Sequence, residues 1–369
     1  MGKTDVLFIK QRIRRGPAIE SSIEDYIEKA FRVHPGINFQ CYELGEKIRI
    51  AEDRVTAGGQ VTQQSIARAR YEQTELCLGY IRQQAPENLF LLNGYLLWHF
   101  DQQFYEKLRP LVRKISAWQL DDPYYVDMSL PFLHLLDTIF TVDTITLPLY
   151  ERYELNAHWL PLACAPEVHR SINDLDEKYR SDVCFIGVPF KGSKRVRTID
   201  AIAGKLTVCN SRIIGATDKE NWTGVLANAD QLSGSLMDEF VTVEEACLYY
   251  NGAAINLNLH KDSYGHAWDR NAHRLPARSP CERTFAIAGC GGFQIMDNDR
   301  PDLAQLFTTN EDIVTFKDPA DLAAKIDYYL AHDDERQQMA RSLQRNVHIG
   351  HSYAARANRI VELAFDTSA

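Results

Sequence analysis

Short apolar runs alternate with amphipathic segments through the first half of the chain. The runs are typical of buried strands, and they lie within residues 5–10, 37–44, 88–94, 114–123, 138–143 and 158–163. The segments between them predict helices, at about 19–33, 63–84, 101–113 and 145–153. Residues 45–62 lack a clear period and contain Gly58 and Gly59, which predicts a loop. Strands that alternate with helices predict right-handed βαβ units and a parallel sheet.

The alternation stops once and then starts again. Residues 165–180 are polar and contain no strand-like run, so we interpret them as a linker. A buried strand at 181–188 begins a second α/β series. Two such halves predict two Rossmann-like domains, residues 1–165 and 166–350, that face each other across a cleft. Ligands of such sheets lie beyond the carboxyl ends of the strands.

Composition and charge narrow the class of protein. The 369 residues are 45% hydrophobic and 25% charged, as in ordinary globular proteins, and the net charge of -9 argues against general nucleic-acid binding. No apolar run approaches the roughly 18 residues of a transmembrane segment. The eight cysteines form no C-x-x-C pair, which predicts reduced thiols, no zinc site and a cytoplasmic protein.

Two common nucleotide-binding motifs are missing from the sequence. No G-x-G-x-x-G follows the first strand, and no G-x-x-x-x-G-K-[ST] is present. The stretch F-I-G-V-P-F-K-G-S-K-R (185–195) instead puts two glycines and the cations Lys191, Lys194 and Arg195 between a strand and a helix. Such a turn suits a diphosphate, although a solvated basic loop has the same composition.

The second series has further polar groups at strand ends. The alternating run I-N-L-N-L-H (255–260) presents Asn258 and His260 on one side, either to a ligand or as part of a half-buried edge strand. Arg270 and Arg274 follow, and Arg283 begins the segment R-T-F-A-I-A-G-C-G-G-F. A small-residue helix broken by glycines, with a cation at its start, suits a phosphate or a solvated basic face.

The first series has one candidate for acid–base chemistry. The run A-W-Q-L-D-D-P-Y-Y (117–125) ends a strand with Asp121 and Asp122, followed by Tyr124. A carboxylate there suits a general base or hydroxyl binding, and a tyrosine suits stacking. An Asp-Pro turn is an equally ordinary explanation.

Taken in order, these motifs resemble the CgeB-like (spore maturation protein) glycosyltransferases. The resemblance rests on W-Q-L-D-D-P, W-L-P-L-A, D-V-C-F-I-G, I-N-L-N-L-H and R-T-F-A-I-A-G-C-G-G-F, and is strongest over residues 115–362. It implies an α/β protein of the GT-B fold that binds a UDP-, GDP- or dTDP-sugar without a metal or other cofactor. It also implies that residues 351–369 form a helix crossing back to the N-terminal domain.

The resemblance implies roles for individual residues. The donor would contact Gly187, Lys191, Arg195, Asn258, His260, Arg283, Thr284 and Gly289. The acceptor side would include Arg15, Gly16 and Tyr124. Asp121 or Asp122 would deprotonate the acceptor hydroxyl if the reaction inverts the anomeric centre, and would only position substrate if it retains configuration.

One position departs from the family pattern. Relatives read R-x-F-E where this chain has Ala286, so an acid suited to the ribose hydroxyls is missing. Either another group such as Glu282 binds the ribose, or donor binding is altered. A non-catalytic sugar- or partner-binding protein and a nucleotide-sugar epimerase are the alternatives to a transferase.

Overall fold

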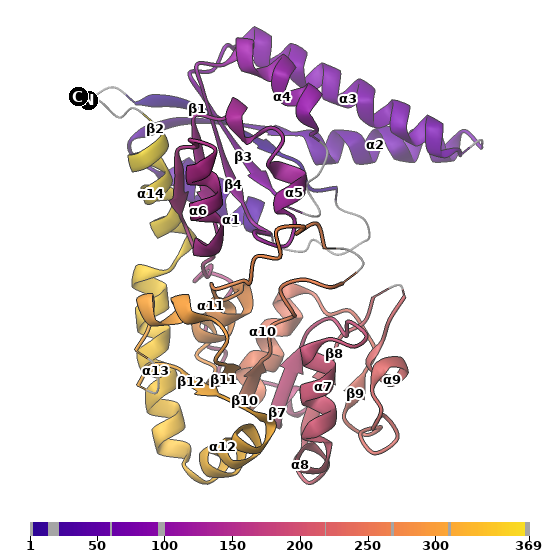
Figure 1. Cartoon of the computed structure of the whole chain (residues 1–369), viewed down its shortest axis with the longest axis vertical. Helices are drawn as coiled ribbons and strands as arrows, with labels where there is room; N and C mark the ends of the chain where they lie inside the picture. Colours follow the sequence, from indigo (N-terminus) through magenta and orange to yellow (C-terminus); the bar gives the residue numbers. More distant parts are fainter. Residues whose placement is uncertain are drawn as a thin grey trace. The chain divides into compact units, whose positions relative to one another are not determined.

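The computed structural model describes residues 3–13, 22–59, 61–94, 100–217, 219–266, 269–308 and 311–365. It contains two compact units, each with its own six-stranded parallel sheet (Figure 1). The first unit extends to Pro161 and includes residues 269–277 and the C-terminal helix. The second unit consists of residues 162–266 and 278–352.

The sheet of the first unit has the strand order β2-β1-β3-β4-β5-β6. Its strands are β1 (Thr4–Lys10), β2 (Ile37–Glu43), β3 (Asn88–Asn93), β4 (Lys114–Gln119), β5 (Thr138–Thr141) and β6 (Ala157–Trp159). The chain moves from β1 to β2 on one side and then returns to β3 on the other, so the order reverses between β1 and β3. The predicted strands and parallel sheet are confirmed.

Helices of the first unit connect these strands. They are α1 (Ile23–Val33), α2 (Leu44–Ala57), α3 (Gln63–Gln84), α4 (Gln102–Leu108), α5 (Val126–Ser129), α6 (Leu147–Arg152) and α14 (Tyr353–Ala364). The helix predicted at 63–84 matches α3. On α14, the Tyr353 ring lies 5.1 Å from that of Tyr26 on α1.

The loop predicted over residues 45–62 is wrong, because most of that range is helix α2. Its buried face includes Leu44, Ile48 and Glu52, a pattern too short and too polar to stand out in the sequence. The buried Glu52 carboxylate accepts a 2.5 Å hydrogen bond from Arg70 on α3. The helix therefore depends on its partner α3, which lies beside it (Figure 1).

The second unit has the strand order β12-β11-β10-β7-β8-β9, which is the doubly wound Rossmann order. Its strands are β7 (Ser181–Ile186), β8 (Ser211–Ile214), β9 (Leu236–Met237), β10 (Ala253–Asn258), β11 (Gln294–Asp297) and β12 (Val314–Phe316). Its helices are α7 (Lys194–Ala201), α8 (Ala203–Thr207), α9 (Trp222–Val225), α10 (Val243–Gly252), α11 (Glu282–Gly289), α12 (Pro319–Ala331) and α13 (Asp333–Gly350). The order reverses between β7 and β10, where a ligand site is expected.

Two further sequence predictions can be compared with the structure. All eight cysteines are free thiols, as predicted. Within the described ranges, no helix has both the length and the apolar character needed to cross a membrane.

Candidate functional site

Two arginines converge at the carboxyl ends of β7 and β10. Arg195 is the second residue of α7 and Arg283 is the second residue of α11. Arg195 Nε and Arg283 Nη1 donate to the same carbonyl oxygen, that of Leu259, at 2.8 and 3.1 Å. Each βα unit at the reversal of strand order thus supplies one guanidinium from the first turn of its helix.

Gly187 allows Arg283 to approach the end of β7. A Cβ atom at Gly187 would lie 3.0 Å from Arg283 Nη2 and 2.9 Å from Cζ of Phe185. The Arg283 guanidinium also lies 5.2 Å from the centroid of the Phe185 ring. The structure therefore brings Gly187, Arg195 and Arg283 together. Lys191 lies exposed in the same loop, where its backbone N–H donates to Glu220 at 3.3 Å.

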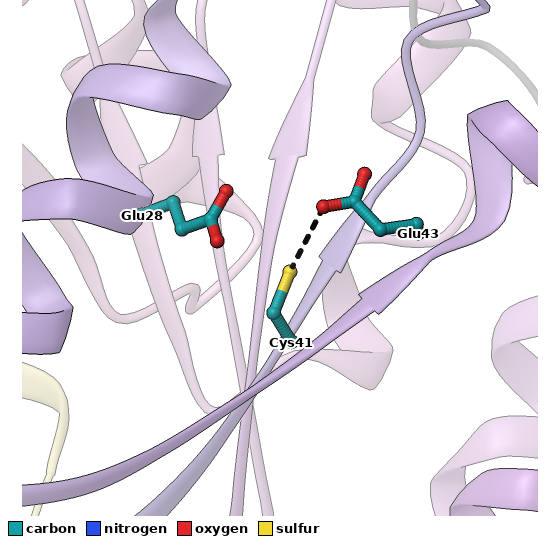
Figure 2. A group of neighbouring side chains, drawn as sticks. All are labelled: Glu28, Cys41 and Glu43. Carbon is teal, nitrogen blue, oxygen red and sulfur yellow. Dashed lines mark hydrogen bonds between the residues drawn. The ribbon is translucent and has the colours of Figure 1, made fainter.

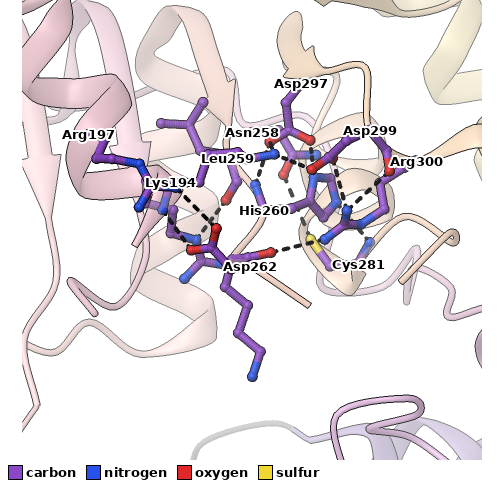
Figure 3. A network of polar contacts seen from close by, with 12 residues as sticks. Lys194, Arg197, Asn258, Leu259, His260, Asp262, Cys281, Asp297, Asp299 and Arg300 are labelled. Atoms are coloured by element: carbon purple, nitrogen blue, oxygen red, sulfur yellow. Dashed lines mark hydrogen bonds and ion pairs between the residues drawn. The ribbon is translucent and has the colours of Figure 1, made fainter. Parts of the chain in front are cut away.

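His260 is held by hydrogen bonds on every polar side (Figure 3). Its Nδ1 lies 3.0 Å from Asp297 Oδ1, and the backbone N–H of Cys281 donates to its Nε2 at 3.2 Å. With Nε2 accepting a hydrogen bond, the ring hydrogen lies on Nδ1, which donates to Asp297. Burial would lower the pKa of His260, but the neighbouring Cys281 and Asp297 raise it above its ordinary value. This buried imidazole joins the end of β10 to the start of α11.

Lys194 lies between two carboxylates beside His260. Its Nζ is 3.2 Å from Asp297 Oδ2 and is also paired with Asp299 (Figure 3). Burial alone would raise the pKa of Asp297, but its contacts with His260 and Lys194 hold that pKa well below its ordinary range. His260, Asp297 and Asp299 are grouped closely enough to hold a metal ion. Lys194 and Arg300, whose Nη1 lies 2.9 Å from Asp299 Oδ1, already balance the charge of the two carboxylates.

A second group with metal-binding side chains lies in the first unit. Glu28, Cys41 and Glu43 gather between α1 and β2, with the Cys41 thiol 3.9 Å from Glu43 Oε1 (Figure 2). Lys10 Nζ lies 2.7 Å from Glu28 and 3.2 Å from Glu43. Burial raises the pKa of the Cys41 thiol, so the thiol is protonated at neutral pH. Here the ammonium group of Lys10 takes the place that a metal ion would occupy.

Asn258 and Thr284 are engaged within the protein. Asn258 Nδ2 donates to Thr284 Oγ1 at 2.8 Å and to Gln294 Oε1 at 2.9 Å, and all three side chains are buried. These contacts fasten β10 to α11 and β11, so both residues position Arg283, whose Nη1 also donates to Asn258 Oδ1. Their role as direct donor contacts stays a prediction.

Gly289 lies at the C-terminal end of α11, away from Arg283 at the start of that helix. It ends α11, about 9 Å along the helix axis from Arg283. A Cβ atom there would lie 2.8 Å from Cβ of His169. Gly289 therefore allows close packing of α11 against the segment that precedes β7.

The adjacent carboxyl groups of the first unit differ in environment. Asp122 is buried, and its Oδ2 accepts hydrogen bonds from Thr141 and Tyr150, both at 2.7 Å. Asp121 is half-buried, and its Oδ2 would lie 2.7 Å from a Cβ atom at Gly94. Asp121 is thus at the sheet edge beside the end of β3, whereas Asp122 lies buried under the turn.

Tyr124, predicted on the acceptor side, lies beside residues 269–277 of the first unit. Tyr124 is half-buried, and its carbonyl accepts the N–H of Arg270 at 2.8 Å. That contact, together with one from Ala272 to Asp127, attaches residues 269–277 to the first unit. Arg270 and Arg274, which the sequence suggested for a phosphate in the second half, belong to that segment. Arg15 and Gly16 lie outside the described residues.

Both a family model and a curated relative that match this chain are linked to glycosyltransferases or to CgeB. Residues 195–362 match the family described as glycosyl transferase-like. Spore protein CgeB of Bacillus subtilis (strain 168) is 29% identical over 232 residues, which cover 61% of this chain and 67% of CgeB.

Solved structures share the fold at low sequence identity. Sucrose-phosphate synthase from Thermosynechococcus elongatus matches with a TM-score of 0.63 at 9% identity, covering 98% of both chains. The "Trehalose-6-phosphate" protein from E. coli, bound with UDP-2-fluoro glucose, matches with a TM-score of 0.60 at 10% identity, covering 98% of this chain and 99% of the other. The predicted GT-B fold class is confirmed.

Proposed function

Because the chain is a CgeB-like glycosyltransferase with the GT-B fold, we propose that it moves a sugar from a nucleotide-sugar donor to an acceptor hydroxyl. A UDP-sugar is the first donor to test, since a protein of similar fold was solved with a UDP-sugar analogue bound. GDP- and dTDP-sugars are the other donors that we consider.

The observation that carries this proposal is the pair of guanidinium groups anchored on the Leu259 carbonyl. A departing nucleoside diphosphate gains negative charge, and fixed cations stabilise that charge in the transition state. The N-termini of α7 and α11 lie at the same sheet edge and add the positive ends of two helix dipoles. Arg195 and Arg283 are thus assigned to the donor diphosphate, with Lys191 beside them.

We also propose that the reaction needs no metal or other cofactor. Lys194 supplies positive charge at Asp297 and Asp299, the place where a divalent cation would otherwise balance the two carboxylates. The two arginines supply the charge that a metal would give to the diphosphate.

Ala286 requires another group for the ribose. It is buried and packs in one apolar cluster with Tyr250 and Cys290. Glu282 is half-buried and lies four residues earlier, on the same face of α11 and nearer to its N-terminus. We assign the ribose hydroxyls to Glu282.

Asp121 is proposed as the general base of an inverting reaction. It is the more exposed member of the Asp121–Asp122 pair and lies at the carboxyl edge of the first sheet, where an acceptor hydroxyl would approach. A carboxylate in reach of that hydroxyl takes its proton as the new glycosidic bond forms. We assign Tyr124, three residues after Asp121, to the acceptor side as a ring for stacking.

The test is a panel of UDP-, GDP- and dTDP-sugars, scored by thermal stabilisation and by slow hydrolysis of the donor. A donor present at 100 times its Kd is expected to stabilise the fold by about 2.7 kcal/mol. Addition of EDTA is expected to change neither readout. Binding without any turnover would favour a non-catalytic binding protein, and no response to any donor would reject the transferase proposal.

Replacing Arg283 by alanine is expected to weaken donor binding by about 10- to 150-fold, because a charge-assisted hydrogen bond contributes roughly 1.5–3 kcal/mol. Titration calorimetry with the best donor measures this change. Arg341→Ala is the matched control, since that arginine lies exposed on α13. An unchanged donor affinity in Arg283→Ala would remove this residue from the site.

A further inference from the structure

Three buried carboxamides form a row across the first sheet. Asn93 and Gln119 are the last residues of β3 and β4 and lie opposite each other in the strand register. Gln11 follows β1 directly, two residues after Ile9, which pairs with Leu91. Gln11 therefore lies at the level of Asn93, and Gln11 Nε2 donates to the carbonyl of Leu92 at 2.8 Å.

The three side chains share one face of the sheet. Ile9, Leu91 and Ala117 each precede one of them by two residues, and these three belong to a single hydrophobic core. Because side chains alternate along a strand, residues two apart point to the same face. The row is the polar margin of that core, at the carboxyl ends of three neighbouring parallel strands.

Each member of the row buries one atom without a hydrogen-bond partner among the residues that the structure describes. These atoms are Gln11 Oε1, Asn93 Nδ2 and Gln119 Nε2, and the side chains are 0%, 3% and 2% exposed. The amide orientation is fixed at Gln11, because a carbonyl oxygen can only accept. The Leu92 carbonyl accepts from Gln11 Nε2, and Tyr105 donates its hydroxyl hydrogen to Asn93 Oδ1 at 2.9 Å.

The row therefore consists of uncharged groups that can donate and accept hydrogen bonds. Burying polar atoms without partners destabilises a folded protein, so such a row indicates groups reserved for a ligand. A hydroxyl group donates one hydrogen bond and accepts others, and adjacent hydroxyls match a row of carboxamides. A phosphate or carboxylate would find no balancing charge in these three side chains.

The position of the row also indicates a ligand. The strand order reverses between β1 and β3, and such reversals are where α/β sheets bind ligands. Asp121 lies at the same edge, with its carboxylate over Gly94, the residue after Asn93. The N–H of Leu120 donates to the carbonyl of Asn93 at 2.7 Å and holds the Asp121 turn against β3.

We propose that Gln11, Asn93 and Gln119 form a subsite for a neutral, hydroxyl-rich acceptor such as a sugar or another polyol. The inference rests on the proposed transferase function, in which Asp121 takes the proton of the acceptor hydroxyl. The carboxamides would hold the neighbouring hydroxyls and so select acceptors that carry several of them.

Saturation-transfer NMR on the full chain, without donor, tests the subsite. The probes are methyl α-D-glucopyranoside, myo-inositol and glycerol, with 1-propanol as a single-hydroxyl reference. Wild type is expected to bind at least one polyol. Gln119→Met, which keeps the side-chain length, is expected to weaken that binding by about tenfold through the loss of a hydrogen bond.

Ser116→Ala is the matched control. Ser116 is on β4 like Gln119 and also buries an unpartnered hydroxyl, judged against the described part of the chain. It lies three residues earlier and therefore on the opposite face. Gln11→Met is the second variant if Gln119→Met does not fold. No polyol binding by wild type, or equal binding by wild type and the folded variant, would overturn the proposal.

The donor measurement separates this inference from the proposed function. Stabilisation by UDP-glucose is expected to be unchanged in Gln119→Met. If the donor binds, and polyols bind equally well to wild type and to Gln119→Met, the subsite is rejected and the transferase proposal stands. Polyol binding that Gln119→Met abolishes, with no response to any nucleotide-sugar, would support the subsite and reject the transferase.

Discussion

Asp121→Asn is expected to lower kcat for sugar transfer by about 10²- to 10⁴-fold, the usual contribution of a positioned general base. Asparagine has nearly the same shape as aspartate but cannot take the proton of the acceptor hydroxyl. The measurement is the initial rate of transfer from the best donor at saturating acceptor.

The binding of both substrates separates a base from a positioning group. Donor affinity is expected to be the same in Asp121→Asn and wild type, because the donor cations belong to the second unit. Asp53→Asn is the control substitution, since Asp53 lies exposed on α2 and pairs with a surface arginine, Arg49. A kcat within about threefold of wild type would exclude Asp121 as the base and would favour a retaining reaction, which needs no protein base at that place.

The sequence predicted the fold well because the fold depends on local periodicity. The apolar runs matched the strands, and the polar segment 165–180 contains no strand. Helix α2 was missed because it is stabilised from outside its own segment. Its buried Glu52 needs Arg70 of α3, and a pattern that includes a buried acid does not read as amphipathic.

The candidate site could be predicted from the sequence only where the position of one residue after a strand is enough to place it. Arg195 and Arg283 stand at helix starts after strands, so a cation at the sheet edge followed from the sequence. The protein partners of Asn258 could not be predicted, because alternation along a strand tells which side a residue faces and not what it contacts there. Gln294, the partner of Asn258, lies on the next strand, 36 residues away.

The carboxamide row was missed although the sequence contains its signal. Gln11 directly follows the first apolar run (5–10), and Asn93 and Gln119 lie within the third (88–94) and fourth (114–123) runs. Taken singly, each of these residues is an ordinary polar residue at the end of a strand. Only the register of the parallel sheet shows that they lie side by side.

Asp122→Asn is expected to remove a large part of the pH dependence of stability. Burial raises the pKa of Asp122 to about 7 from an ordinary value of 3.8, although the hydroxyls of Tyr150 and Thr141 oppose the shift. The folded state therefore keeps its proton over a range in which the unfolded chain loses it. The stabilising contribution is complete below about pH 4 and is lost as the pH rises to about 7.

The size of the effect follows from the shift in pKa. Between these limits the free energy of unfolding of wild type is expected to fall, relative to that of the Asp122→Asn variant, by on the order of 4 kcal/mol. Urea denaturation at several pH values measures the difference. Asparagine keeps an oxygen that accepts from Tyr150 and Thr141, so the variant is expected to fold.

Glu24→Gln is the parallel substitution, because burial also raises the pKa of Glu24 to about 7. Each variant is expected to remove its own share of the slope, and the double variant to remove both, since the two carboxyls share no hydrogen-bond partner among those found. If Asp122→Asn and wild type keep a constant difference from pH 4 to pH 8, Asp122 is ionised in the folded protein throughout. In that case Asp122, like Asp121, would be a candidate for the acid–base step.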